Sequence, residues 1–215
     1  QNLPSTIMQN FAKVTTTTTD TVTGIFDSNA TLFTFNPKEI TVDNEDPGFR
    51  IIESNQKDKL QSFFKKESED KYKNLNFWMP PSRWTATIGV NYYGDYINSA
   101  VYKKSGSGSN KTEWTTQIQI PGFYEVFVYT SELPMMGWRH RGGEEKKIQY
   151  YTVKHDDGEE EISVETGRGR QGWRTLGSFY FSKGEAKITL SDKGSESNQI
   201  IFADAVKWVY TNNNK

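Results

Sequence analysis

Three absences narrow the chemistry of this 215-residue chain before any motif is considered. The chain contains no cysteine, which excludes disulfide bonds and thiolate metal sites but is compatible with any compartment. It has no run of the roughly 18 apolar residues that a membrane helix needs, so we expect no membrane span. Its net charge is −1, which gives no overall field for nucleic acid, and we expect no nucleic-acid partner.

Residue types that commonly carry catalysis are also scarce. The two histidines, His140 and His155, lie in different local contexts. There is no nucleophile motif, phosphate-binding loop or histidine pair at metal-ligand spacing. A polysaccharide lyase needs a base beside a uronate proton, and His140 with Arg139 and tyrosines could supply one. Because such a set can be assembled in most aromatic-rich proteins, the sequence favours a non-catalytic domain without a cofactor.

The apolar content is carried unusually by aromatic side chains. Hydrophobic residues make up 34% of the chain and aromatic residues 14%. Phe, Tyr and Trp suit pleated, half-buried surfaces, which favours β structure. The Asp-Gly turn in HDDG (155–158) predicts a hairpin between flanking strands, and SKG (182–184) predicts a second hairpin. The segment 199–210 is apolar on both faces and predicts a central strand.

The N-terminal part and two internal segments differ from this pattern. Residues 1–40 are rich in threonine and predict an extended arm that takes its order from another element or domain. The segment 54–74 is highly charged, and the spacing of Leu60 and Phe64 predicts a short helical insert. The loop 103–111 is rich in glycine and serine, which predicts flexibility. The main domain is therefore expected over 41–215.

Four segments occur in an order that resembles the golvesin and xanthan-lyase carbohydrate-binding-like domain family. They are PGFYEVFVYT (121–130), YYTVKHDDGEEEISVE (150–165), GWRTLGSFYFSKGEAKITLSD (172–192) and IIFADAVKW (200–208). With VDNEDPGF upstream, the resemblance covers about residues 40–210. It implies an all-β, antiparallel β-sandwich of the galactose-binding-like jelly-roll type. It also implies a non-catalytic module of secreted or cell-surface bacterial proteins, often beside a hydrolase or lyase domain.

One candidate ligand-binding site is the glycine-flanked loop 135–143. It carries Trp138, Arg139, His140 and Arg141 and has no periodic apolar face. Sugars present C–H faces to aromatic rings, and arginine binds carboxylates, so this loop would suit an acidic polysaccharide. The alternative is a loop that docks on a partner domain.

A second candidate is a tyrosine group near Trp84. It comprises Tyr92, Tyr93 and Tyr96 within NYYGDYIN (91–98). An exposed platform of these rings would suit a glycan. Alternation within a strand would instead bury half of them, and core or edge packing is the favoured interpretation.

Three further residues are assigned structural roles. Trp173 is expected to close the end of the core where its strand begins, with Arg174 stacked or paired at the rim. Asp204 lies inside an apolar strand, and a buried carboxylate needs partners. We expect it to accept backbone or arginine hydrogen bonds across the sandwich.

The turn VDNEDPGF offers oxygen ligands at short spacing in Asp43, Asn44 and Asp46. Hard cations such as calcium bind clusters of this kind, and a structural calcium is one expectation. The segment lacks the complete EF-hand pattern, and Asx turns explain the same residues equally well.

The sequence thus favours an accessory domain that binds polysaccharide or glycan and is secreted, periplasmic or on the bacterial surface. The alternative is a structural or protein-interaction domain that packs on a neighbouring domain or subunit. The chain begins at Gln1 without an initiator methionine, which fits a processed secreted protein or a trimmed chain.

Overall fold

The structure is a computed structural model that describes residues 38–53, 71–76, 78–131, 147–167 and 169–211, and the backbone of three strands within 15–35. Every regular element in these ranges is a β-strand, which confirms the all-β class. No helix in the described part of the chain has the length and apolar character that crossing a membrane requires. Residues 54–70 lie outside the described ranges, so the helical insert stays a prediction.

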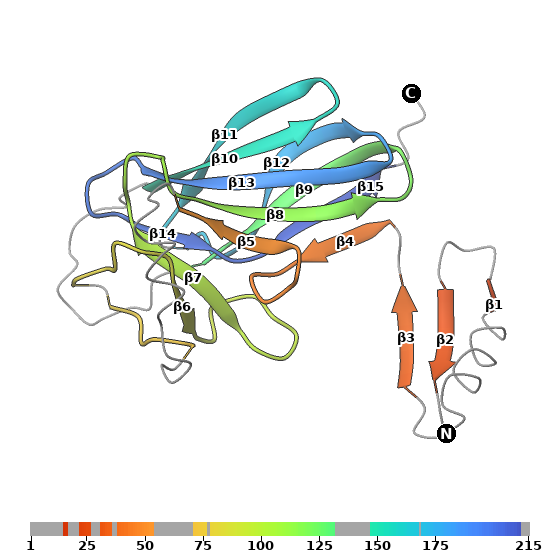
Figure 1. The fold of residues 1–215 in the computed structure, drawn as a ribbon, viewed down its shortest axis with the longest axis horizontal. Coiled ribbons are helices and arrows are strands. Elements are labelled where there is room, and N and C mark those ends of the chain that lie inside the picture. The colour runs from red at the N-terminus through yellow and green to blue at the C-terminus, as the bar shows by residue number, and fades with distance from the viewer. Residues whose placement is uncertain are drawn as a thin grey trace.

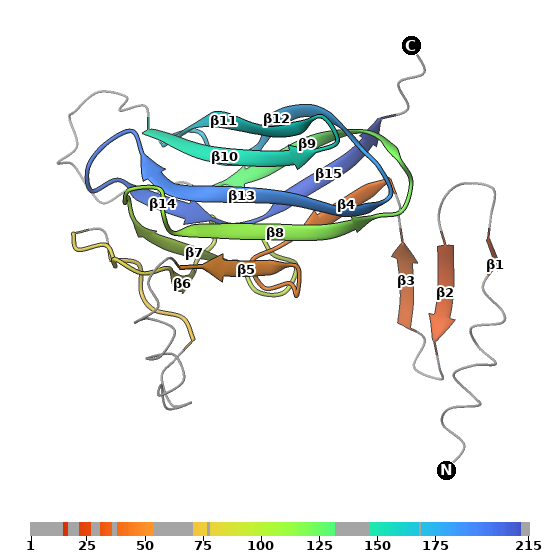
Figure 2. The same ribbon diagram turned by 45° about the horizontal axis from the view of Figure 1, so that its top comes forward.

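Two antiparallel sheets form the sandwich, as the two layers in Figure 2 show. The five-stranded sheet has the order β11-β10-β13-β8-β5. Its strands are β5 (Phe49–Ile52), β8 (Lys111–Ile118), β10 (Lys147–His155), β11 (Gly158–Thr166) and β13 (Gly184–Gly194). The four-stranded sheet has the order β12-β9-β15-β4. Its strands are β4 (Glu39–Val42), β9 (Gly122–Thr130), β12 (Gly172–Phe181) and β15 (Val206–Thr211).

Two smaller sheets accompany the sandwich (Figure 1). One has the order β14-β7-β6 and consists of β6 (Thr85–Ile88), β7 (Ser99–Lys104) and β14 (Ile200–Ala203). The other is formed by β1 (Thr15–Thr16), β2 (Val22–Phe26) and β3 (Thr31–Phe35). The extended conformation predicted for the threonine-rich arm is confirmed for these three strands. Among the described strands they pair with one another and not with the sandwich.

The core lies between the two sandwich sheets because strand alternation points one set of side chains inward. On β9, Tyr124, Val126 and Val128 are fully buried, whereas the residues between them are partly exposed. On the facing sheet, Ile188 and Leu190 of β13 belong to the same core cluster. Each large apolar side chain buried in this way contributes about 1.5–3 kcal/mol. This packing fixes the edges from which the site loops project.

One predicted hairpin is confirmed and the other is wrong. β10 and β11 pair antiparallel as far as His155 and Gly158, with the HDDG turn between them. β12 and β13 lie in different sheets: β12 pairs with β9, and β13 pairs with β10 and β8. The SKG turn therefore carries the chain from one sheet to the other, and Phe181 and Ala186 both enter the core between them.

The central strand predicted over 199–210 is interrupted at Asp204. Its first half, β14, pairs with β7, and its second half, β15, lies between β9 and β4. The Nε1–H of Trp114 donates to the Asp204 carbonyl oxygen at 3.0 Å. The break moves the chain from the small sheet into the sandwich, so the Asp204 carboxylate lies at a junction of sheets.

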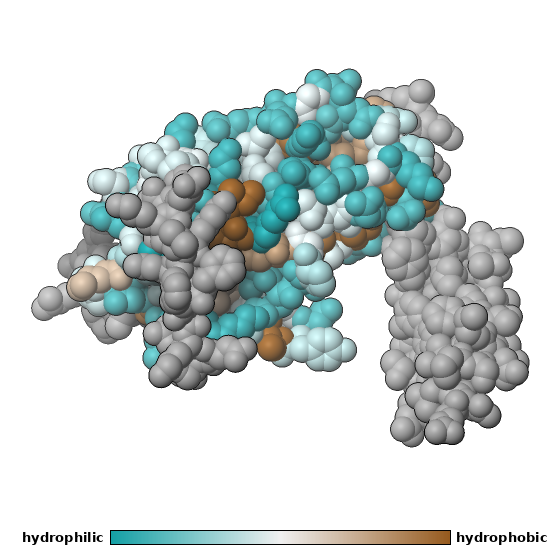
Figure 3. Space-filling view, in the orientation of Figure 1, coloured by the Kyte–Doolittle hydropathy of each residue, from teal (hydrophilic) through white to brown (hydrophobic). Residues whose placement is uncertain are grey.

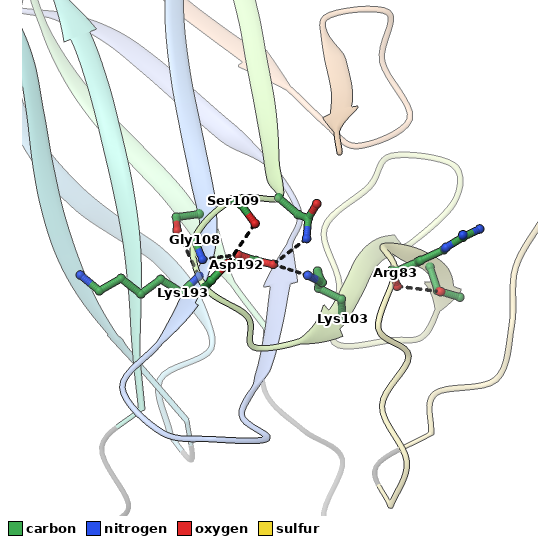
Figure 4. Close-up of polar contacts among 10 residues, drawn as sticks. Arg83, Lys103, Gly108, Ser109, Asp192 and Lys193 are labelled. Carbon is green, nitrogen blue, oxygen red and sulfur yellow. Dashed lines mark hydrogen bonds and ion pairs between the residues drawn. The ribbon is translucent and has the colours of Figure 1, made fainter. Parts of the chain in front are cut away.

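The loop between β7 and β8 is held by the buried carboxylate of Asp192 (Figure 4). Lys103 Nζ forms an ion pair with Asp192 Oδ2. The carboxylate also accepts hydrogen bonds from Gly108 N at 2.7 Å and Asn110 Nδ2 at 3.1 Å. Gly106 N donates to the Asp192 carbonyl oxygen at 2.7 Å. Composition predicted a flexible loop, but the structure shows one bonded to a residue distant in sequence.

Candidate functional site

A solvent-open pocket of about 350 Å³ lies beside the turn that follows β4. This turn supplies one wall through Asp43, Glu45 and Asp46, with Thr41 at the end of β4. Asp43 N donates to Asp46 Oδ2 at 2.8 Å, and Asp46 N donates to the Asp43 carbonyl oxygen at 3.1 Å. Such side-chain-to-backbone bonds close Asx-type turns and fix the direction of the carboxylates.

The opposite wall is the loop 89–98 between β6 and β7. The loop is closed by Gly89 N, which donates to the Asn98 carbonyl oxygen at 3.0 Å. Asn98 Nδ2 donates to the Tyr92 carbonyl oxygen at 2.9 Å. The pocket-lining residues of this loop are Tyr93, Asp95, Tyr96 and Ile97. The pocket therefore combines carboxylates from both walls with aromatic and apolar groups from one.

The two tyrosines of the pocket have different surroundings. The Tyr93 ring packs against Tyr129, with ring centroids 5.7 Å apart, and against Trp173, at 5.2 Å. Lys207 Nζ lies 4.7 Å from the centre of the Trp173 ring on the outer face of the sheet. Tyr96 is 99% exposed. Tyr93 is thus a supported wall, and Tyr96 is available to contact a ligand.

Asp43 is the most buried carboxylate of the pocket, with 9% of the residue exposed. Its Oδ1 accepts a hydrogen bond from Asn44 N at 2.7 Å. Burial raises the pKa of Asp43 to about 7, and repulsion from Asp46, Glu45 and Asp95 acts in the same direction. The Asn44 hydrogen bond opposes this rise without cancelling it. The carboxyl group of Asp43 therefore titrates near neutral pH.

Asp204 lies behind the pocket and interacts with it. Its Oδ2 accepts hydrogen bonds from Ser131 Oγ at 2.8 Å and from Tyr93 N at 3.2 Å. Burial raises the pKa of Asp204 well above its usual value despite these bonds, and the charge of Asp43 adds to the rise. Of the two alternatives that the sequence suggested, the backbone hydrogen bond is present, and Ser131 supplies an additional side-chain donor. By bonding to Tyr93 N, Asp204 positions the loop that carries the pocket tyrosines.

Glu45 is the pocket carboxylate that has a cation. Lys71 Nζ forms an ion pair with Glu45 Oε2, and Ser99 Oγ donates to Glu45 Oε1 at 2.7 Å. Burial opposes ionisation of Glu45, but the bonds from Lys71 and Ser99 hold its pKa below the usual value. Glu45 is therefore ionised and already paired, unlike Asp43.

The predicted tyrosine group is divided by the structure. Tyr93 and Tyr96 line the pocket, whereas Tyr92 and Trp84 are buried. Trp84 belongs to the main core. Tyr92 packs against Phe202 with ring centroids 5.8 Å apart. Trp84 and Tyr92 are therefore packing residues, as the favoured interpretation held, whereas Tyr96 is an exposed ring.

The position of Trp173 differs from the expectation. Trp173 lies opposite Tyr129 in the β12–β9 register, on the face away from core residue Val128, so it packs outside the core. Arg174 lies opposite Val128 and is directed inward. Its Nε is buried without a hydrogen-bond partner among the residues that the structure describes. Trp173 thus supports Tyr93 at the pocket instead of closing the sandwich.

Two predicted sites remain predictions. The loop residues Trp138, Arg139, His140 and Arg141 lie outside the described residues. Calcium binding at Asp43, Asn44 and Asp46 is also untested. In the described ranges, no group of three or more His, Cys, Asp or Glu side chains is arranged to hold a metal ion.

Sequence reasoning missed four lining residues: Thr41, Glu45, Asp95 and Ile97. Glu45 stood inside the acidic turn already considered, and Asp95 stood between the candidate tyrosines. These residues form one site only because two segments about 50 residues apart in sequence lie side by side in the fold. A single sequence does not reveal such a long-range contact.

Comparison with known proteins supports the architecture. The family model of the golvesin C-terminal domain matches residues 75–210. A xanthan lyase from Paenibacillus aligns with a TM-score of 0.56 and 20% identity over 85% of this chain. The chain spans 14% of the length of that lyase. This likeness confirms the predicted sandwich fold and the resemblance on which the prediction rested.

More distant structural matches have TM-scores below 0.5. An exo-β-1,3-galactanase from Phanerochaete chrysosporium, solved with β-1,3-galactotriose, has a TM-score of 0.41 and 13% identity over 88% of this chain and 33% of its own. The module TmCBM61, solved with β-1,4-galactotriose, has a TM-score of 0.31 and 14% identity over 80% of this chain and 83% of its own. No curated protein sequence matches the chain.

Proposed function

Because this chain belongs to the golvesin C-terminal domain family, we propose that it is a non-catalytic accessory module that binds carbohydrate. The proposed site is the pocket between the turn after β4 and the loop 89–98. The module would belong to a larger secreted or surface-attached bacterial protein. The small share of the xanthan lyase that this chain spans supports a role as one part of such a protein.

The observation that carries the proposal is the pairing of Tyr93 and Tyr96 with carboxylates in one open pocket. Sugar rings pack their C–H faces on aromatic side chains, and their hydroxyl groups donate hydrogen bonds to carboxylates. Tyr93 is held from behind by Trp173 and Tyr129, so it is preorganised before a ligand arrives. A rigid sandwich that presents loops of this kind is a common scaffold for binding sites.

A second candidate is a protein-interaction domain, and exposed apolar residues favour it. Trp78 is 80% exposed, and Met79 and Val90 are also exposed. The face drawn in Figure 3 is mostly hydrophilic, with separate hydrophobic residues among the polar ones. Scattered residues of this kind are ordinary on protein surfaces, so this candidate ranks second.

The test is a glycan-array screen of the full chain, of Tyr96→Ala and of the matched control Tyr180→Ala. Tyr180 is also an exposed tyrosine, but it packs against Phe123 at the other end of β9. We expect Tyr96→Ala to weaken binding roughly threefold to tenfold, the value of one aromatic contact, and Tyr180→Ala to leave it unchanged.

The outcomes separate the candidates. Binding that both variants retain would move the site away from the pocket, with the loop around Trp138 next to be tested. Absence of binding to every glycan would contradict the proposal and favour the interaction domain. Release of reducing sugar from a bound glycan would contradict the non-catalytic assignment.

A further inference from the structure

Resting on the proposed function, we infer that the pocket takes a sugar that carries a protonated amine and rejects sugars that carry a carboxylate. The ligand would therefore be a cationic sugar. It differs from the acidic polysaccharide that Arg139 and Arg141 suggest from sequence. The pocket that the structure describes is lined by acids, whereas that loop carries arginines.

The lining of the pocket is acidic and carries no cation. Four of its eight described residues, Asp43, Glu45, Asp46 and Asp95, are carboxylic acids, and none is Lys, Arg or His. Lys71 lies nearby, but it is already paired with Glu45. A uronate entering the pocket would lie close to carboxylates of the same charge. This repulsion opposes its binding whenever several of these acids are ionised.

Asp43 gives the pocket an acceptor that the chain leaves open. The residue is about nine-tenths buried and faces the pocket. Asn44 N donates to its Oδ1, and its Oδ2 is open to solvent on the pocket side. Because most of this residue is withdrawn from water, a charge-assisted hydrogen bond from a ligand N–H group gains more here than at a fully exposed acid.

The chain itself shows which group satisfies a carboxylate in such a setting. Asp192 is fully buried, and Lys103 Nζ is its cationic partner, with Gly108 N and Asn110 Nδ2 as further donors. The pocket has carboxylates from two walls and no internal ammonium. A ligand ammonium, which has three N–H donors, would occupy the place that Lys103 holds beside Asp192.

The aromatic wall identifies the ligand as a sugar rather than an isolated amine. Tyr93, Tyr96 and Ile97 supply apolar contact beside the acids. An amino sugar presents a C–H face to such rings and its ammonium to the carboxylates in the same molecule. A neutral sugar uses only the first of these interactions together with ordinary hydroxyl hydrogen bonds, so it binds more weakly.

The experiment compares four probes against the full chain by isothermal titration calorimetry near pH 7, where the carboxyl group of Asp43 is partly ionised. The probes are a chitosan oligosaccharide, the chitin oligosaccharide of equal length, an oligogalacturonate and oligolysine. We expect chitosan to bind roughly five- to tenfold more tightly than chitin, and galacturonate not to bind. The preference should decrease as salt is added, because the pocket is open to solvent.

Two isosteric variants locate the effect. Asp95→Asn removes one exposed carboxylate of the pocket, and Asp157→Asn removes an exposed carboxylate of the β10–β11 turn. We expect the first to reduce the preference for chitosan about threefold and the second to leave it unchanged. Both residues are exposed, so neither substitution should prevent folding.

The results distinguish this inference from the proposed function. Equal affinity for chitin and chitosan, or tighter binding of galacturonate, would overturn the amine preference while keeping a glycan-binding module. Oligolysine that binds as tightly as chitosan, with the same loss in Asp95→Asn, would overturn the sugar class in favour of a basic peptide. Binding of none of the probes and of no glycan on the array would reject both.

Discussion

Asp192 and Asp43 are both at least nine-tenths buried, but their partners differ. Asp192 has a buried lysine and further donors from the loop between β7 and β8. Asp43 has one backbone amide and three neighbouring acids, and burial raises its pKa to about 7. The first arrangement joins two segments of the fold. The second leaves an acidic group at the wall of an open pocket.

The comparison separates structural from functional burial of charge. A carboxylate that is paired inside the protein contributes to the position of its loop and is closed to outside partners. A carboxylate that is buried without a cation destabilises the unliganded fold where it is ionised, and carboxylates with a pKa raised in this way cluster at functional sites. Asp204 is intermediate: Ser131 and Tyr93 N donate to it without a cationic partner in the described part of the chain, and it positions the loop behind the pocket.

The largest effect is expected from breaking the Asp192 arrangement. In Lys103→Met, the carboxylate keeps its neutral donors but loses its cation, so we expect the free energy of unfolding to fall by about 3–5 kcal/mol. Urea unfolding measures this change. The double variant Lys103→Met/Asp192→Asn should recover part of the loss, because it removes the uncompensated charge.

The matched control is Lys193→Met. Lys193 is half exposed and lies 3.9 Å from Glu161 in a surface ion pair. Its loss should cost about 0–1 kcal/mol. A similar cost for the two lysine variants would mean that the Lys103 pair contributes no more than a surface contact, and the contrast between the two regions would not hold.

Much of this architecture was predictable because local patterns carry it. The alternation of residues along β9 correctly predicted a strand. The Asp157-Gly158 turn correctly predicted the hairpin between β10 and β11. The SKG turn looked equivalent, but pattern does not tell a hairpin from a crossover between sheets, since both leave Phe181 and Ala186 facing the core. The pairing of β12 with β9 depends on contacts across about 50 residues.

The pocket was predictable only in pieces for the same reason. The sequence singled out the acidic turn as a possible calcium site and the tyrosine segment as a possible sugar-binding platform, but as two separate sites. Their union depends on Asp204, whose carboxylate holds Tyr93 N across the break between β14 and β15. Which tyrosines are exposed also follows from this geometry, so Tyr92 and Tyr96 could not be separated by composition.

The next effect concerns pH. In the folded chain, the raised pKa of Asp43 means that its proton is retained up to about pH 7, whereas an unfolded Asp loses it near pH 4. The folded state therefore binds more protons between these values. Its stability is greatest below about pH 4 as far as Asp43 is concerned, and decreases as pH rises towards about 7.

The corresponding variant is Asp43→Asn, which keeps the oxygen that accepts from Asn44 N. We expect it to remove a pH-dependent loss of roughly 3 kcal/mol between about pH 4 and 7, measured as urea midpoints across that range. Burial also raises the pKa of Asp204, so some pH dependence of stability should remain. Asp157→Asn, in an exposed turn, serves as the control, and an unchanged slope in Asp43→Asn would contradict the assignment.

The smallest effect tests how closely the loop fits Asp192. A Cβ added at Gly106 would lie 2.3 Å from Asp192 Oδ2, so Gly106→Ala must displace either the loop or the carboxylate. We expect a loss of about 1–3 kcal/mol in urea unfolding, and little change in Ser107→Ala, whose side chain bonds to exposed Ser109. Equal stability of the two variants would show that the loop yields easily. Close packing of Gly106 against Asp192 would then contribute little to stability. The ion pair with Lys103 would remain as the feature that distinguishes Asp192 from Asp43.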